Sequence, residues 1–213
     1  MNHNMENLIE KLANDKNRPE KLSSPAKRFL KWMALAFFYL SVALTAIGIR
    51  IDSTEFMRSP FLILETLTLI FLALSSAFSV FILSVPGSQF NSKKKVTLFP
   101  LLFWVLLITL KFIQTKEFNL TFKSILGFAC INEILFVGVP VSLLLFFMVK
   151  KASPTSLMWS GWLAAISGVS LAGVGLQFTC SNRDILHIAI SHLGPILTIG
   201  LIGILVGKKF LKW

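Results

Sequence analysis

Long apolar runs separated by short polar segments make up most of the chain. A helix needs about 20 apolar residues to cross the hydrocarbon core of a bilayer. Six runs reach that length, at residues 32–49, 60–85, 96–113, 125–149, 157–179 and 185–207. The third run is the weakest because Lys111 interrupts its end, although a lysine stem can extend to the interface. The pattern predicts an all-α, polytopic membrane protein: six transmembrane helices in one bundle over residues 29–213, after a tail at residues 1–28.

Composition supports this fold class. Hydrophobic residues make up 54% of the chain and charged residues 15%, a balance that a soluble domain with a solvated surface rarely reaches. A formal net charge of +11 is often a sign of nucleic-acid binding. Here the basic residues lie between apolar runs, which membrane topology explains better. We therefore expect a lipid bilayer as a partner and no direct nucleic-acid binding.

The distribution of lysine and arginine predicts the orientation. If the amino terminus is cytoplasmic, 15 of these residues lie on the inner side and 6 on the outer side. Cytoplasmic segments carry the excess of positive charge in membrane proteins, so both termini are predicted to be cytoplasmic. Residues 1–27 are polar and lack the pattern of a cleavable signal peptide, which predicts that the first span is retained.

Polar side chains within the spans gather in one half of the predicted membrane. Such groups are costly in a bilayer and usually face the bundle interior or water. With the predicted orientation Glu65, Asn132, Glu133, His187 and His192 all lie in the outer half, on the same side as both cysteines, Cys130 and Cys180.

Three interpretations of this gathering stay open. Cys130 and Cys180 can form a disulfide in an oxidising compartment. Their thiolates can also bind a soft metal ion together with one histidine, for example His187, with Glu133 on the same helical face as Cys130. The third interpretation is that the polar groups only join helices to one another. His187 and His192 are five residues apart and point in different directions on an α-helix, so we do not expect both in one site.

No enzyme motif is present. The chain has no phosphate-binding glycine loop, no His-Glu-x-x-His pair and no nucleophile elbow. We predict that the protein is not an enzyme and needs no cofactor, apart from transient binding of a heavy metal. Small residues at four-residue spacing are expected to pack helices closely: Ser160, Ala164, Gly168 and Ala172, with Gly203 and Gly207.

The tail contains one short amphipathic pattern. Leu8, Ile9 and Leu12 share a face of a possible helix over residues 4–15, followed by Asp15, and Arg18-Pro19 would end the helix. Such a short helix is not stable alone in water. It can fold into a partner groove or onto the membrane surface, and a disordered leader is the remaining interpretation.

Taken in order, several elements resemble the NrsF-type anti-sigma factors, which are six-span inner-membrane proteins that hold an extracytoplasmic-function sigma factor inactive. The similarity covers nearly the whole chain. Its marks are Leu8-Ile9, Leu12-Ala13, Arg18-Pro19, Glu65, Ser84-Val85-Pro86-Gly87, Cys130, Pro140, Lys150-Lys151-Ala152-Ser153-Pro154, Gly161, Leu176-Gln177-Phe178-Thr179-Cys180, Asp184, His187, His192, Pro195 and the ending Gly207-Lys208-Lys209-Phe210-Leu211-Lys212-Trp213.

The resemblance implies a location in a bacterial inner membrane and a sigma factor as the partner of the tail. The residues it places in sigma-factor binding are Leu8, Ile9, Leu12, Asp15 and Arg18. It also implies that Cys130 and Cys180 sense oxidative or heavy-metal stress from the periplasm, with Glu133, His187 and His192 as neighbours. Thr179 stands where the family often has a histidine. This difference removes a possible metal ligand and favours thiol redox chemistry.

Two other functions compete with this one. A small-molecule or metal-ion transporter would need polar groups through the whole membrane depth, whereas the inner halves of the spans are almost wholly apolar. An assembly or scaffold protein would not need its tail.

Overall fold

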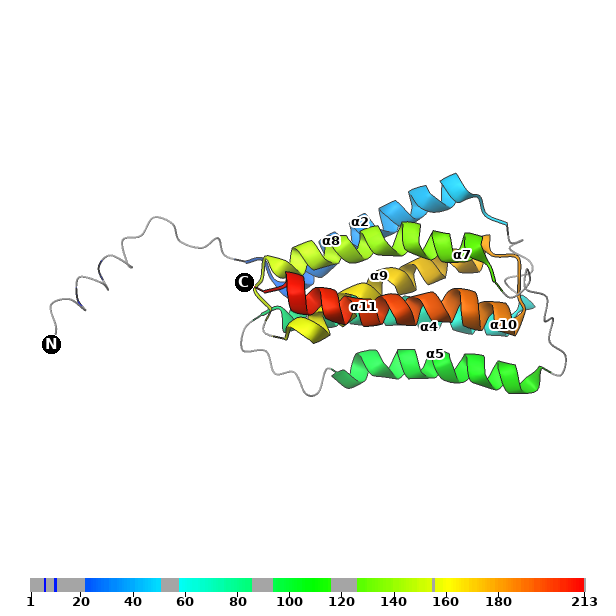
Figure 1. Cartoon of the computed structure of the whole chain (residues 1–213). Helices are drawn as coiled ribbons and strands as arrows, with labels where there is room; N and C mark the ends of the chain where they lie inside the picture. The colour runs from blue at the N-terminus through cyan, green and yellow to red at the C-terminus, as the bar shows by residue number, and fades with distance from the viewer. Residues whose placement is uncertain are drawn as a thin grey trace.

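The computed structural model describes residues 22–50, 58–85, 94–115, 126–154 and 156–212, together with Glu6 and Glu10. Within these residues all regular structure is helical (Figure 1). The elements are α2 (Pro25–Ile47), α4 (Pro60–Leu83), α5 (Lys94–Gln114), α7 (Phe128–Glu133), η1 (Ile134–Gly138), α8 (Val139–Lys150), α9 (Leu157–Thr179), α10 (Ile185–His187), η2 (Ile188–Leu193) and α11 (Gly194–Phe210). Here η denotes a π-helix.

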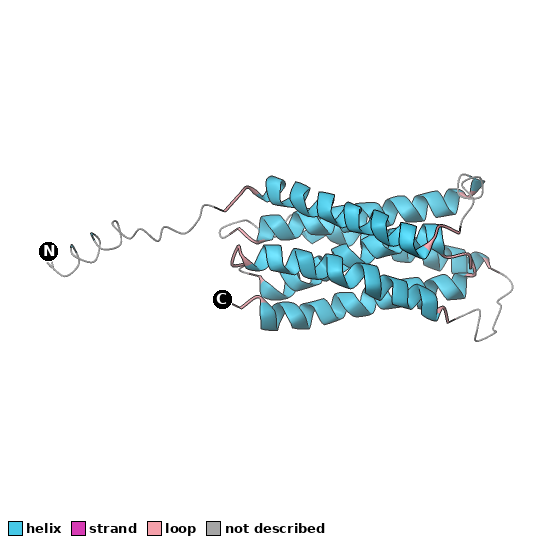
Figure 2. Cartoon of the chain, turned by 90° about the horizontal axis from the view of Figure 1, so that it is seen from above, coloured by secondary structure: helices cyan, strands magenta, loops and turns pink. Residues whose placement is uncertain are grey.

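The six predicted spans are confirmed. Six helical stretches of the described chain are long and apolar enough to cross a membrane. The fourth runs through α7, η1 and α8, and the sixth through α10, η2 and α11. The protein is therefore a multi-pass membrane protein, with its helices side by side in one bundle (Figure 2).

The first span begins earlier than predicted, at residue 25 instead of 32. Ser24 caps α2 by accepting a hydrogen bond from the backbone N–H of Lys27 at 3.4 Å, and Pro25 occupies the first helical turn, where its missing N–H costs nothing. Arg28, predicted as part of the tail, lies inside α2 and is buried. Its Nη2 donates to the carbonyl of Phe81 at 3.2 Å and to Ser84 Oγ at 3.0 Å, both at the end of α4.

Helix α9 is the centre of the bundle. Of the residues in its apolar window 83% are buried, against 22% for α2 and for α5, and it packs against α4, α8 and α11. Gly203 and Gly207 do pack closely on α9, but against Gly161 and Ala165, while Gly168 of the predicted stripe lies against Ser142 of α8. A Cβ on Gly161 would lie 2.6 Å from the Cα of Gly207, so the backbones of α9 and α11 touch there.

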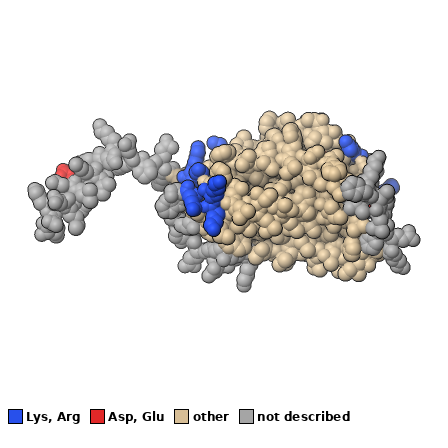
Figure 3. Space-filling view, in the orientation of Figure 1, with Lys and Arg blue, Asp and Glu red and all other residues tan. Residues whose placement is uncertain are grey.

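The two ends of the bundle differ in charge. Helix α2 begins, and α8 and α11 finish, at one end, while α7 and α10 lie at the other (Figure 1). Most of the lysine and arginine side chains visible in Figure 3 gather at the first end, where Lys150, Lys208 and Lys209 occupy the last turns of α8 and α11. We call this the basic end, and the other the cysteine end because it holds Cys130 and Cys180.

Candidate metal-binding and redox site

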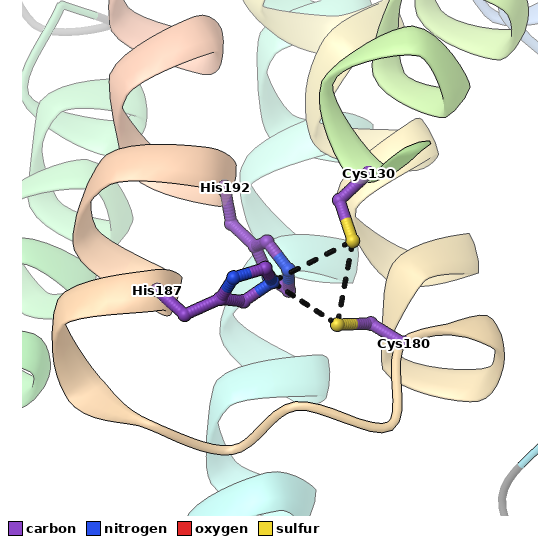
Figure 4. Close-up of side chains that lie close together, drawn as sticks. All are labelled: Cys130, Cys180, His187 and His192. Atoms are coloured by element: carbon purple, nitrogen blue, oxygen red, sulfur yellow. Dashed lines mark hydrogen bonds between the residues drawn. The ribbon is translucent and has the colours of Figure 1, made fainter. Parts of the chain in front are cut away.

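Four side chains from four elements meet at the cysteine end (Figure 4). Cys130 comes from α7, Cys180 caps the carboxyl end of α9, His187 ends α10, and His192 lies in η2. The two Sγ atoms are 3.4 Å apart, and His187 Nε2 lies 3.5 Å from Cys130 Sγ and 3.3 Å from Cys180 Sγ. One ligand atom from each of the four residues fits within 4.8 Å of the other three.

The presence of both histidines corrects the prediction that only one of them joins the site. In an α-helix, five residues turn the chain by about 140° past a full number of turns, so His187 and His192 would point apart. A π-helix carries an additional residue in each turn, with i→i+5 bonding, and η2 covers Ile188–Leu193. Residues five apart therefore return to nearly the same face. The two imidazole rings lie with centroids 5.3 Å apart and planes at 76°.

A proline follows each π-helix, two residues after its end. Pro140 has no N–H, so the carbonyl of Phe136 loses its bond within the helix. Tyr39 of α2 donates its hydroxyl to that carbonyl at 2.9 Å. Pro195 stands in the same relation to η2. A proline alone does not predict this change to a π-helix, because α5 stays α-helical around Pro100.

The distances among Cys130, Cys180 and His187 are close to those between three ligands of a tetrahedral metal site, and His192 offers a ligand atom within 4.8 Å of theirs. Bond lengths of about 2.3 Å for Zn–S and about 2.05 Å for Zn–N place tetrahedral ligands about 3.8 Å apart for S···S and about 3.6 Å apart for S···N. The Sγ···Sγ distance of 3.4 Å and the Sγ···Nε2 distances of 3.3 and 3.5 Å are shorter by at most about 0.4 Å. Two thiols and two imidazoles form a donor set that suits zinc and softer divalent ions.

The same pair of thiols is arranged for redox chemistry. Both cysteines are free, and a disulfide would require the Sγ atoms to approach to about 2.05 Å. A hydrogen bond from Cys130 lowers the pKa of the Cys180 thiol. Burial opposes this effect, and hydrogen bonding with His187 adds to it. The thiolate is both the reactive nucleophile and the metal-binding form of cysteine, and these hydrogen bonds favour it at Cys180.

A cavity of about 550 Å³ lies beside the cysteines. Its lining includes Arg50, Asn132, Glu133 and Phe136. Glu133 is fixed in place because Thr179 Oγ1 lies 2.7 and 2.9 Å from its two carboxylate oxygens and can donate to either. Cys130 is only partly buried, whereas Cys180 is 4% exposed. The cavity therefore offers a route by which a small molecule or ion reaches the cysteines.

The sequence favoured thiol redox chemistry because Thr179 replaces a possible histidine ligand. The structure offers a different second histidine. In the structure His192 occupies the cluster together with His187, and Thr179 orients Glu133 instead.

One contact at the site was missed in the sequence. Gly127 lies directly against the His187 imidazole, and a Cβ at this position would collide with the ring. The backbone N–H of Gly127 also donates to Ser191 Oγ, within η2, at 2.8 Å. A single glycine before an apolar run looks like ordinary loop composition, so no sequence signal marks it.

The remaining predicted residues lie elsewhere. Asn132 is exposed on the cavity wall and outside the four-residue cluster. Glu65 of α4 is fully buried and accepts a hydrogen bond from Trp104 Nε1 at 3.2 Å. The predicted sigma-factor-binding residues lie outside the described residues: Leu8, Ile9, Leu12, Asp15 and Arg18.

Comparison with known families identifies the chain over almost its full length. The family model NrsF, described as negative regulator of sigma F, matches residues 12–213. This match confirms the family resemblance seen in the residues. No curated protein and no solved structure matches the chain.

Proposed function

The chain belongs to the NrsF family of negative regulators of sigma F, and we propose that it is an anti-sigma factor controlled by the cluster at its cysteine end. The tail would hold an extracytoplasmic-function sigma factor inactive at the cytoplasmic face of a bacterial inner membrane. A soft metal ion or an oxidant that reaches Cys130 and Cys180 from the periplasm would release it.

The observation that carries the sensing proposal is the meeting of four soft or borderline ligands at one end of the bundle. Their ligand atoms lie within 4.8 Å of one another although the residues come from three different spans or their ends. A bound metal would join α7, α9 and η2. Oxidation would join only α7 and α9, as the two thiols lose two protons and two electrons to an oxidant such as a peroxide and form an S–S bond.

Charge supports the proposed orientation. The basic end carries most of the lysines and arginines seen in Figure 3, as expected for a cytoplasmic face. The tail precedes α2, and α2 begins at this end. Sensing and sigma-factor binding would thus occupy opposite faces of the membrane.

Helix α2 offers a physical connection between the two faces. Its carboxyl end reaches the cavity, where Ile47 and Arg50 form part of the lining and the Arg50 N–H donates to the carbonyl of Phe178 in α9 at 3.0 Å. Its amino end continues into the tail. A change in how α2 packs at the cavity can therefore alter the position of the tail, provided that the signal binds one arrangement more tightly than the other.

The first experiment tests sigma-factor binding. The solubilised full-length protein and a variant lacking residues 2–20 are used as baits, and co-purifying sigma factors are identified by mass spectrometry. We expect an extracytoplasmic-function sigma factor with the full-length chain alone. Equal recovery by both baits would remove the tail from the proposal, and recovery by neither would contradict sigma-factor binding.

The second experiment separates metal sensing from redox sensing. Serine at both Cys130 and Cys180 should leave sigma-factor binding intact and abolish release by either signal. Alanine at His192 should abolish only metal-induced release, because a disulfide needs no imidazole. A double-serine protein that still releases its sigma factor would disprove sensing by the cysteines.

A further inference from the structure

Glu65 is a buried carboxylate with an incomplete set of hydrogen bonds. It is 0% exposed, and its Oε1 accepts a hydrogen bond from Trp104 Nε1 at 3.2 Å. Its Oε2 has no hydrogen-bond partner among the described residues. A carboxylate in this state is costly in an apolar bundle, so a compensating partner is expected nearby.

His192 also lacks hydrogen-bond partners within the described chain, and its ring can donate where Glu65 can accept. It is 1% exposed, and neither ring nitrogen has a hydrogen-bond partner in the described part of the chain. Its charge acts on Glu65 more strongly than that of Lys111 or Arg183. Those two cations have other contacts: Lys111 Nζ lies 3.8 Å from the Phe61 ring centroid, and Arg183 Nη2 donates to the Gln177 carbonyl at 3.1 Å. His192 also acts on Glu133, but Thr179 Oγ1 already lies within hydrogen-bond distance of both oxygens of that carboxylate.

From these two deficiencies we propose that Glu65 is a positioning residue for His192 as a metal ligand. A histidine that binds a metal through one ring nitrogen usually donates the N–H of its other nitrogen to a carboxylate, which sets the tautomer and the ring orientation. Glu65 of α4 serves His192 in this way when the cluster binds a metal. The inference rests on the metal-binding part of the proposed function and extends the site to α4 and, through Trp104, to α5.

The hydrogen bond from Trp104 supports this assignment. It holds Oε1 and leaves Oε2, the oxygen without a partner, to accept from the histidine. A purely structural Glu65 would also destabilise the bundle when replaced, so stability alone cannot test the inference. Metal affinity, and whether the loss of affinity depends on His192, can test the inference.

The experiment is a cobalt(II) titration of the full-length protein in detergent, followed through the visible d–d absorption of a tetrahedral thiolate–imidazole site. For Glu65→Gln we expect affinity about 10- to 100-fold weaker than wild type, as for other carboxylate partners of metal-binding histidines. Asp184→Asn is the matched control. It removes one negative charge at the same end, three residues before His187, and should change the affinity far less.

A double-mutant cycle identifies the residue through which Glu65 acts. If it acts through His192, Glu65→Gln should cause no further loss in a His192→Ala background. An equal loss in both backgrounds, or wild-type affinity in Glu65→Gln, would overturn the inference while metal binding itself stands. A wild-type protein without the cobalt absorption would overturn metal binding and this inference together. If Glu65→Gln does not fold, Trp104→Phe takes its place in the same cycle. It should weaken cobalt binding, and unchanged affinity would count against the inference.

Discussion

Substitution of alanine for Gly127 tests the geometry of the cluster without altering any ligand. The added Cβ would lie 3.1 Å from His187 Nε2 and 3.2 Å from Nδ1, with Cε1 closer still. Ordinary contacts of a Cβ begin near 3.4 Å, so the imidazole must retreat by several tenths of an ångström or more. Metal–ligand distances tolerate only about 0.2 Å. The ring therefore moves out of reach of an ion held by the two thiols.

We expect Gly127→Ala to weaken cobalt(II) binding by about 10- to 100-fold, the range seen when the surroundings of a ligand are disturbed. The assay is the cobalt titration in detergent, with thermal unfolding as a check on folding. Gly194→Ala is the matched control because Gly194 is two residues from His192, yet its Cβ would meet only the Ala189 carbonyl oxygen, at 3.7 Å. Wild-type affinity in Gly127→Ala, or an equal loss in Gly194→Ala, would refute the steric argument.

Two further predictions concern the bundle. Gly161→Ala should destabilise it by about 1–3 kcal/mol in SDS or thermal unfolding, because the Cβ meets the backbone of Gly203 and Gly207. Gly173→Ala, whose Cβ meets only the side-chain ends of Ile196 and Leu69, should cost less, and equal costs would contradict the explanation. Tyr39→Phe should cost about 0.6 kcal/mol and at most about 1.7 kcal/mol, since it leaves the Phe136 carbonyl unpaired. In a Pro140→Ala background the cost of Tyr39→Phe should be smaller, because the N–H that returns at position 140 can bond the Phe136 carbonyl. An unchanged cost would show that Pro140 is not the reason why this carbonyl depends on Tyr39.

The spans could be predicted because length and apolarity alone decide whether a helix crosses a bilayer. The fifth span, at 157–179, agrees with α9 at both ends. The start of the first span was missed because Lys27, Arg28 and Lys31 look like a polar tail. A buried arginine needs acceptors from another element, and those of Arg28 lie more than 50 residues later in the chain. Such long-range hydrogen bonds leave no local pattern.

Only part of the candidate site could be predicted, because the rest also depends on contacts between helices. Topology alone brought Cys130, Cys180 and the histidines to one end. The angle between His187 and His192 was derived from α-helical geometry, and η2 makes that geometry wrong. Pro195 was visible in the sequence, but the effect of a proline on the turn before it depends on whether neighbouring helices stabilise a kink, a break or a π-turn.

Differences in packing between the helices limit how a signal can cross the bundle. The backbones of α9 and α11 touch at Gly161 and Gly207, so a relative movement of these helices would break contacts that small residues alone permit. Helix α2 has only 22% of its apolar window buried and is held to the bundle by separate hydrogen bonds from Arg28, Trp32 and Tyr39. Fewer packed contacts must be exchanged when α2 shifts than when α9 shifts. A coupling energy of about 1–3 kcal/mol, typical of allosteric proteins, is comparable to a few such bonds, so binding at the cysteine end can move α2 more readily than α9.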